Sequence, residues 1–153
     1  MLEELILTVL MTSVPLVYAA TGELVAERSG VLNLGVEGMM LMGAVAAFAA
    51  VFATGSLTLG ILAGGFAGAM TAAVFALFVL GLATNQVATG LALTIFGTGL
   101  SGLVGAPLVG HAIDGLPQLS LPVLSDIPFV GRLLFGQDVM VYLVVLIVAD
   151  HRA

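Results

Sequence analysis

The amino-acid sequence predicts an all-α fold, a polytopic bundle of transmembrane helices with about four full spans and a truncated fifth. Hydrophobic residues make up 61% of the chain and charged residues only 8%, and residues 38–113 contain no charged side chain. A soluble domain needs a polar surface around its core, whereas a helix that crosses a bilayer needs about 20 apolar residues in succession. The sequence therefore predicts one transmembrane domain over residues 1–153.

The first predicted span covers residues 5–20 and contains Pro15. Proline is tolerated in a membrane helix where neighbouring groups satisfy the carbonyl that it leaves free. Glu3 and Glu4 precede the span, whereas a cleavable signal peptide begins with a positively charged region. We therefore expect this segment to remain in the protein as a membrane helix.

A polar segment, residues 22–36, follows and is interrupted by glycines. Because glycine weakens a helix, the sequence predicts a break here. One interpretation is a solvated loop. The other is an irregular backbone at membrane depth, which is tolerated only where protein buries it or where it lines an aqueous cavity, as in a transport path. In that case Glu27, Arg28 and Glu37 would be partly buried charges that need each other or a helix N-terminus.

Three further full spans are predicted, over residues 38–53, 57–83 and 87–106. Two short polar segments, residues 54–56 and 84–86, separate them. Such clusters of polar residues and glycine are typical of turns between helices.

Residues 107–137 hold most of the prolines together with charged side chains, which indicates a loop at a membrane surface. We expect this loop to be extracytoplasmic, an orientation that puts Arg28 and Arg152 inside and only Arg132 outside and so agrees with the positive-inside rule. Residues 139–149 begin a fifth span but stop too soon to cross a bilayer.

Small residues recur at every fourth position along the third and fourth spans. Such stripes allow helix backbones to approach closely, which is how apolar helices associate in lipid. We therefore assign a role in helix packing to five glycines: Gly60, Gly64, Gly68, Gly90 and Gly102.

Several other kinds of site are disfavoured. The G-x-G-x-x-G match at residues 97–102 lies inside a span and follows no strand, so it does not indicate nucleotide binding. His111 and Asp114 are too few ligands for a metal site. The serines within the spans have no histidine partner nearby in the sequence, so we expect no catalytic residue and no enzyme. The net charge of −6 without a basic cluster argues against nucleic acid, and we expect no cofactor and no metal.

Three segments resemble a known family: "GELVAERSGVLNLGVEGMMLMGA" (22–44), "TNQVATGLALTIFGTGLSG" (84–102) and "LSDIPFVGRLLFGQD" (124–138). They are similar to the permease subunits of bacterial ABC importers for nucleosides and simple sugars, within the broader branched-chain amino acid and ribose permease family. The resemblance implies a multi-pass protein of the bacterial plasma (inner) membrane. It also implies three protein partners: a cytoplasmic ATPase subunit, an extracytoplasmic substrate-binding protein and a second permease subunit.

The resemblance places candidate translocation-path residues in two polar motifs. The first motif contributes Glu23, Glu27, Arg28, Asn33 and Glu37, and the second contributes Asn85, Gln86 and Thr89. The resemblance does not indicate which of these residues touches substrate.

The chain departs from the family at its end, where "VADHRA" replaces an apolar continuation. The family's permeases continue with a basic cytoplasmic helix that engages the ATPase, so we expect this chain to be the N-terminal half only. The sequence contains neither a P-loop nor a lysine, and energy from ATP must therefore come through a partner. The alternative is a small oligomeric pore or structural membrane protein without ATP coupling, which explains the stripes but not the polar motifs.

Overall fold

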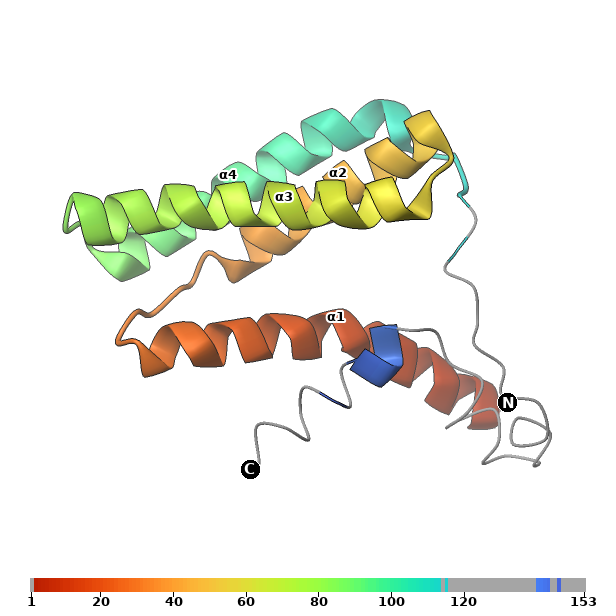
Figure 1. Ribbon diagram of the computed structural model, residues 1–153, viewed down its shortest axis with the longest axis horizontal. Coiled ribbons are helices and arrows are strands. Elements are labelled where there is room, and N and C mark those ends of the chain that lie inside the picture. Colours follow the sequence, from red (N-terminus) through yellow and green to blue (C-terminus); the bar gives the residue numbers. More distant parts are fainter. Residues whose placement is uncertain (1, 114, 116–139, 144–145, 147–153) are drawn as a thin grey trace. The chain divides into compact units, whose positions relative to one another are not determined.

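The computed structural model describes residues 2–113, 115, 140–143 and 146, and the regular elements in this part of the chain are all helical (Figure 1). The all-α prediction is therefore confirmed. Two compact units divide the chain, one formed by residues 1–22 and 115–153 and the other by residues 23–114.

The first unit contains most of helix α1 (Leu2–Arg28), which includes the predicted first span. The hydroxyl group of Tyr18 donates a hydrogen bond of 2.9 Å to the main-chain carbonyl of Met140. Residues 140–143 and 146 are helical. The remainder of the predicted fifth span, and most of the predicted loop at 107–137, lie outside the described residues.

The break after the first span is shorter than the sequence predicts. Residues 22–28 were expected to belong to an interrupted segment, but α1 continues through Gly22 to Arg28, and only residues 29–35 are non-helical. One glycine in a helix costs about 1 kcal/mol relative to alanine, which is too little to end a helix whose neighbours favour it. The helix ends instead at Arg28, just before Gly30, whose φ of +80° is left-handed.

The second unit contains the other helices. They are α2 (Val36–Thr54), α3 (Leu57–Ala76), the π-helix η1 (Leu77–Gly81), α4 (Gln86–Gly105) and the short 3-10 helix η2 (Ala106–Leu108). The predicted spans agree with these bounds to within a few residues, although the third span changes from α-helix to π-helix before it ends.

Local capping explains where the helices change direction. Gly55 has a left-handed φ of +68° and its N–H donates 2.7 Å to the carbonyl of Val51, which ends α2. Ser56 then accepts a hydrogen bond from the N–H of Leu59 and begins α3. Asn85 does the same for α4, because its side-chain oxygen accepts a 3.0 Å hydrogen bond from the N–H of Ala88. These contacts satisfy N–H and C=O groups that every helix end leaves free.

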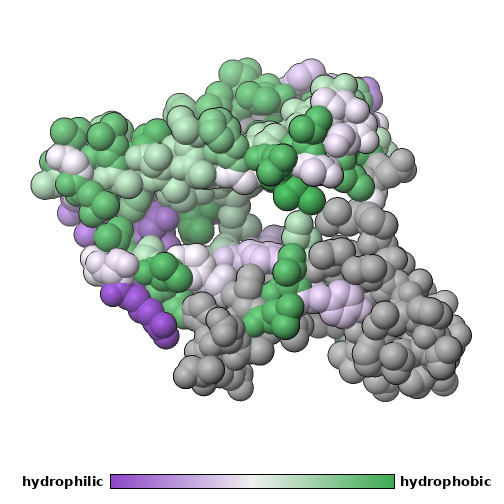
Figure 2. All heavy atoms as spheres, in the orientation of Figure 1, coloured by the Kyte–Doolittle hydropathy of each residue, from purple (hydrophilic) through white to green (hydrophobic). Residues whose placement is uncertain are grey.

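Three helical segments in the described part of the chain are long and apolar enough to cross a membrane: Val36–Thr54, Leu57–Gly81 and Gln86–Leu108. Many of their large hydrophobic side chains are exposed, Ile95 by 75% and Phe66 by 69%. Figure 2 shows hydrophobic residues over much of the visible surface of these helices. Surface of this kind is stable in contact with lipid or with other apolar helices rather than with water.

Helix α2 packs against both α3 and α4, and glycines stand where the backbones come closest. A Cβ atom built at Gly97 of α4 would lie 2.6 Å from the Cα atom of Gly38 in α2. On the other side of α2, a Cβ atom at Gly64 would lie 3.0 Å from the carbonyl oxygen of Gly43. The distance at Gly97 is shorter than two carbon atoms can approach, so a side chain there requires the backbones to separate. The distance at Gly64 is tight, and a side chain there requires its neighbours to move by a few tenths of an ångström.

The packing glycines named from the sequence do not share one environment. A Cβ atom at Gly60 would lie 3.2 Å from the carbonyl oxygen of Ala47, whereas one at Gly68 would only touch Met39, at 4.0 Å. No described atom lies within 4 Å of a Cβ at Gly102. On α4 the close approach thus involves Gly90 and Gly97 and does not extend to Gly102.

Few side chains are buried inside this unit. The core consists of Phe75, Val79 and Leu93, with Val31 and Met39 packed against them. Val31 belongs to the non-helical segment, so the break between α1 and α2 is attached to the core of the second unit.

Candidate functional site

The candidate site is the non-helical segment Ser29–Gly35 with the side chains that hold it. Its first residues form a Schellman motif, in which the N–H of Val31 bonds to the carbonyl of Ala26 and the N–H of Gly30 to the carbonyl of Glu27. This motif needs a left-handed residue after the helix, and Gly30 supplies it without steric cost. The sequence E-R-S-G-V thus ends α1 and turns the chain toward α2.

Two side chains from different helices then bind successive main-chain N–H groups of the segment. The N–H of Leu32 donates a 2.7 Å hydrogen bond to Oε1 of Gln86, in the first turn of α4. The N–H of Asn33 donates a 2.9 Å hydrogen bond to Oε1 of Glu23, in α1. Backbone outside a helix has no helical partner for these groups, so the two side chains take that place.

Asn33 and Thr94 complete the attachment of the segment. Oδ1 of Asn33 accepts a 3.0 Å hydrogen bond from the N–H of Gly35, which is an Asx turn that leads into α2. The hydroxyl group of Thr94, one helical turn beyond Gly90 on α4, donates 2.9 Å to the carbonyl of Leu34. The segment is therefore held by side chains of α1 and α4 as well as its own.

Gly90 allows the segment to lie directly on α4. A Cβ atom at this position would be 2.9 Å from the main-chain nitrogens of both Leu34 and Gly35. Any side chain would push the segment away from the helix. Gly90 thus packs against a loop, whereas the sequence predicted a contact between helices.

The three residues of the second polar motif make three different contacts. Gln86 holds Leu32, as described above, whereas the exposed Asn85 caps α4. The hydroxyl groups of Thr89 and Thr84 are 2.9 Å apart and share a hydrogen bond. These three polar groups all lie at the N-terminal end of α4, the end that also meets the Ser29–Gly35 segment.

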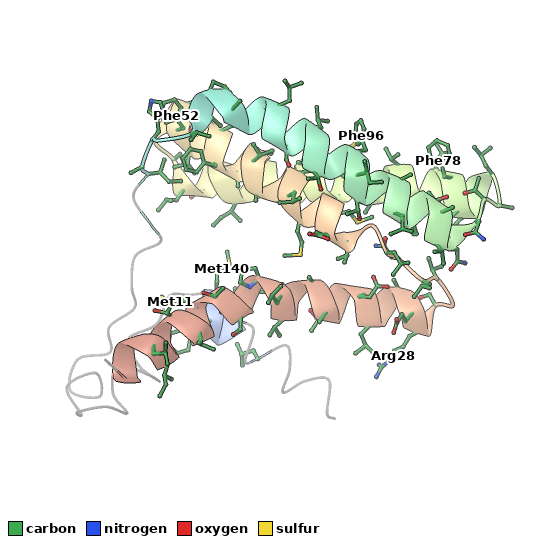
Figure 3. All side chains as sticks on the ribbon, turned by 180° about the vertical axis from the view of Figure 1, so that it is seen from behind. Met11, Arg28, Phe52, Phe78, Phe96 and Met140 are labelled. Carbon is green, nitrogen blue, oxygen red and sulfur yellow. The ribbon has the colours of Figure 1, made fainter. Side chains whose placement is uncertain are left out.

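The charged residues of the first motif are arranged differently from the expectation of partly buried charges. Glu27, Arg28 and Glu37 are exposed, and among the described residues none of them forms an ion pair. Figure 3 shows Arg28 at the end of α1 with its side chain pointing away from α2. Arg28 lies in the last turn of α1 and Glu37 in the first turn of α2, where the helix dipoles favour charges of these signs. Glu27 and Arg28 lie in the part of α1 that was expected to be non-helical, and both side chains are exposed there.

Glu23 is the charged residue of this motif that enters the site. Its side chain is partly buried, and while Oε1 accepts the Asn33 N–H, Oε2 is buried and has no hydrogen-bond partner among the described residues. The two oxygens of one carboxylate thus have different environments.

Thr94 is the site residue whose role the sequence did not predict. In the sequence it is one of the small residues that recur at every fourth position of the fourth predicted span, and a threonine inside an apolar helix ordinarily bonds to its own helix. Thr71 and Thr98 do so, with bonds to the carbonyls of Ala67 and Thr94. No pattern in the sequence distinguishes Thr94 from them.

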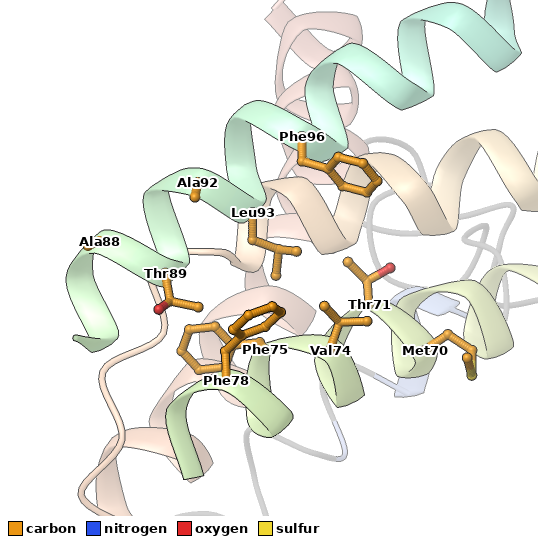
Figure 4. A pocket seen from close by; sticks show the side chains of 10 residues that line it. All are labelled: Met70, Thr71, Val74, Phe75, Phe78, Ala88, Thr89, Ala92, Leu93 and Phe96. Atoms are coloured by element: carbon orange, nitrogen blue, oxygen red, sulfur yellow. The ribbon is translucent and has the colours of Figure 1, made fainter. Parts of the chain in front are cut away.

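A separate apolar pocket of about 620 Å³ lies between the α3–η1 helix and α4 (Figure 4). Its walls include Met70, Phe75, Phe78, Leu93 and Phe96, and its hydroxyl groups come from threonines. Figure 4 shows the side chains of both helices directed toward this space. It has no charged group and does not include the segment 29–35.

Comparison with known proteins gives one family and several relatives. Residues 5–149 match the family described as branched-chain amino acid transport system / permease component. The chain is 43% identical over 137 residues to the putative glucose ABC transporter permease protein TsgC13 of Haloferax volcanii, which covers 87% of this chain and 42% of that protein.

Two further relatives are named for nucleosides. The guanosine ABC transporter permease protein NupQ of Bacillus subtilis is 29% identical over 83% of this chain and 43% of its own length. The nucleoside ABC transporter permease protein NupC of Lactococcus lactis is 26% identical over 97% of this chain and 50% of its own length. The chain thus spans about half the length of the curated relatives that it matches. No solved structure matches it significantly.

Proposed function

The chain belongs to the branched-chain amino acid transport system / permease component family, and on this basis we propose that it forms part of the translocation path of an ATP-binding-cassette importer for sugars or nucleosides. It is a multi-pass membrane protein, and its relatives are transport permeases rather than enzymes. The proposed location is the bacterial plasma (inner) membrane.

The observation that carries the proposal is the Ser29–Gly35 segment between α1 and α2. Spanning helices satisfy their own backbone, and irregular backbone beside them needs either protein partners or water. Here side chains of Glu23, Gln86 and Thr94 supply the partners. Transporters use such non-helical segments to bring main-chain and side-chain polar groups together where a solute passes. We therefore assign the path to this end of the second unit, with Glu23, Asn33 and Gln86 nearest to it.

The proposed partners follow from the energy that uptake requires. Import against a gradient must be coupled to a source of free energy, which in an ATP-binding-cassette importer is ATP hydrolysis, and this sequence contains no lysine and hence no P-loop. A cytoplasmic ATPase subunit would provide the energy, an extracytoplasmic binding protein would deliver the solute, and a second permease subunit would complete the path.

The experiment is uptake of labelled glucose and guanosine by cells that lack their own importers. The chain is expressed with a cognate ATPase subunit, a binding protein and a second permease polypeptide. We expect accumulation of one of these solutes above the external concentration, and loss of accumulation when this chain is omitted.

A matched strain carries an ATPase subunit with its catalytic lysine replaced. Accumulation should disappear there as well. Uptake that only equilibrates the solute, and that persists with the inactive ATPase, would show an uncoupled pore and contradict the proposal.

A further inference from the structure

The Glu23 carboxylate has one satisfied oxygen and one unsatisfied oxygen. Oε1 accepts the hydrogen bond from the N–H of Asn33 at 2.9 Å. Oε2 is buried without a hydrogen-bond partner among the described residues. Glu23 is the one residue of the described chain with a buried side-chain oxygen or nitrogen in this condition.

Such an oxygen calls for a physical explanation. A buried acceptor loses its hydrogen bonds to water and gains nothing in exchange, and native structures contain few of them. The cost is larger for a carboxylate than for a neutral group, because hydrogen bonds to a charged acceptor are the stronger ones. A donor that reached Oε2 would therefore bind favourably, because the fold has already removed this oxygen from water.

The second unit offers no obvious donor of its own. Gln86 and Thr94 are already engaged with Leu32 and Leu34, and Arg28 points away from α2. A group that visits the site can supply the donor that these side chains do not.

We propose that Glu23 is a substrate-binding residue whose Oε2 accepts a hydrogen bond from a hydroxyl group of the transported solute, an inference that rests on the proposed function. A sugar and the ribose ring of a nucleoside both carry hydroxyl donors, so one acceptor serves either class. A hydroxyl donating to a carboxylate makes a short, charge-assisted bond.

The position of Glu23 links a solute contact at Oε2 to the Ser29–Gly35 segment. Oε2 is covered in the described state, so a solute reaches it only when a neighbouring group shifts. The other oxygen of the same carboxylate holds the Asn33 N–H, and the segment is attached to α4 through Gln86 and Thr94. Binding at Oε2 therefore changes the protection of the Asn33 amide.

The test is hydrogen–deuterium exchange of the full chain in lipid nanodiscs, read on peptides that contain residues 29–35. Glucose, guanosine and leucine are added in separate titrations. We expect glucose or guanosine, but not leucine, to change the exchange rate of this segment. Glu23→Gln keeps one oxygen for Asn33 and replaces the other with a donor, so it should raise the half-maximal solute concentration by about tenfold or more.

Glu4→Gln is the control, since it removes the same charge near the other end of α1 and should leave the response unchanged. Thermal unfolding of Glu23→Gln checks that the fold is retained. If solute changes the exchange rate of residues 29–35 equally in Glu23→Gln and in the unmodified chain, the assignment of Glu23 is overturned. The proposed function still stands in that case if uptake depends on this chain. The assignment is also overturned if leucine alone elicits the response, or if no solute does so in a chain that supports uptake.

Discussion

Oε1 of Gln86 lies 2.7 Å from the main-chain nitrogen of Leu32, although 54 residues separate the two in the sequence. Through this bond the first turn of α4 holds the loop that precedes α2. Both residues lie in the polar motifs that the sequence singled out, and the structure brings these motifs together at one end of the second unit.

Replacement of Gln86 tests this bond. Gln86→Leu removes the acceptor for the Leu32 N–H and should lower the free energy of unfolding by about 1 kcal/mol, while Gln86→Glu keeps an oxygen at the same length and should remain near the original stability. Thermal unfolding in detergent measures both, and faster amide exchange at residue 32 should accompany the leucine variant alone. Equal stability of the two variants would contradict the attachment.

Because Gly97 contacts Gly38, the effect of a glycine-to-alanine substitution on stability should depend strongly on its position along α4. Gly97→Ala places a Cβ atom 2.6 Å from Cα of Gly38, and the separation of two backbones that it requires should cost about 1–3 kcal/mol. Gly99→Ala, two residues away, meets nothing within 4 Å among the described residues and should be neutral or slightly stabilising. If both variants unfold at the same temperature, α2 and α4 do not cross at Gly97.

Ala83 is the one non-glycine residue in the described chain with a positive φ, +52°, in the connection between η1 and α4. The left-handed conformation costs an alanine about 1 kcal/mol, so Ala83→Gly should raise the free energy of unfolding by up to about 1 kcal/mol. Part of this gain is offset by the greater freedom of glycine in the unfolded chain. Ala69→Gly, inside α3, should instead lower the free energy of unfolding by about 1 kcal/mol. A comparable loss in Ala83→Gly would rule out strain at Ala83.

The predicted orientation is tested by single cysteines, since the chain contains none. Ser56 and His111 lie at one end of the second unit, where the Phe52 and His111 rings are 4.7 Å apart, and Ser29 lies at the other end with Gln86. If the loop at 107–137 is extracytoplasmic, an impermeant thiol reagent should label Ser56→Cys in intact cells and leave Ser29→Cys unlabelled until the membrane is opened. Labelling of Ser29→Cys alone would reverse the orientation.

The sequence by itself determined the class of fold, its apolar surroundings and the approximate bounds of the helices. The charge-free block at 38–113 has no stable arrangement other than apolar helices in a bilayer, and turn-forming residues such as Gly55 and Asn85 fix the helix ends locally. These features depend on composition and on neighbours along the chain. The end of α1 is also decided by residues near it in the sequence. The predicted break began at Gly22, whereas the helix continues through Gly22 and ends just before Gly30.

Only the tertiary structure decided which residues meet. Helices α2, α3 and α4 are apolar on every side, so their sequences contain no polar face that would show which side turns inward. The choice of Gly97 over Gly102 follows from how α4 is rotated about its axis when backbones pack. The choice of Thr94 over Thr98 follows from their positions along that axis, because the two residues lie one turn apart on the same face. Position along the axis of α1 separates Glu23, which reaches Asn33, from Glu27, which lies one turn further along the same face and remains exposed.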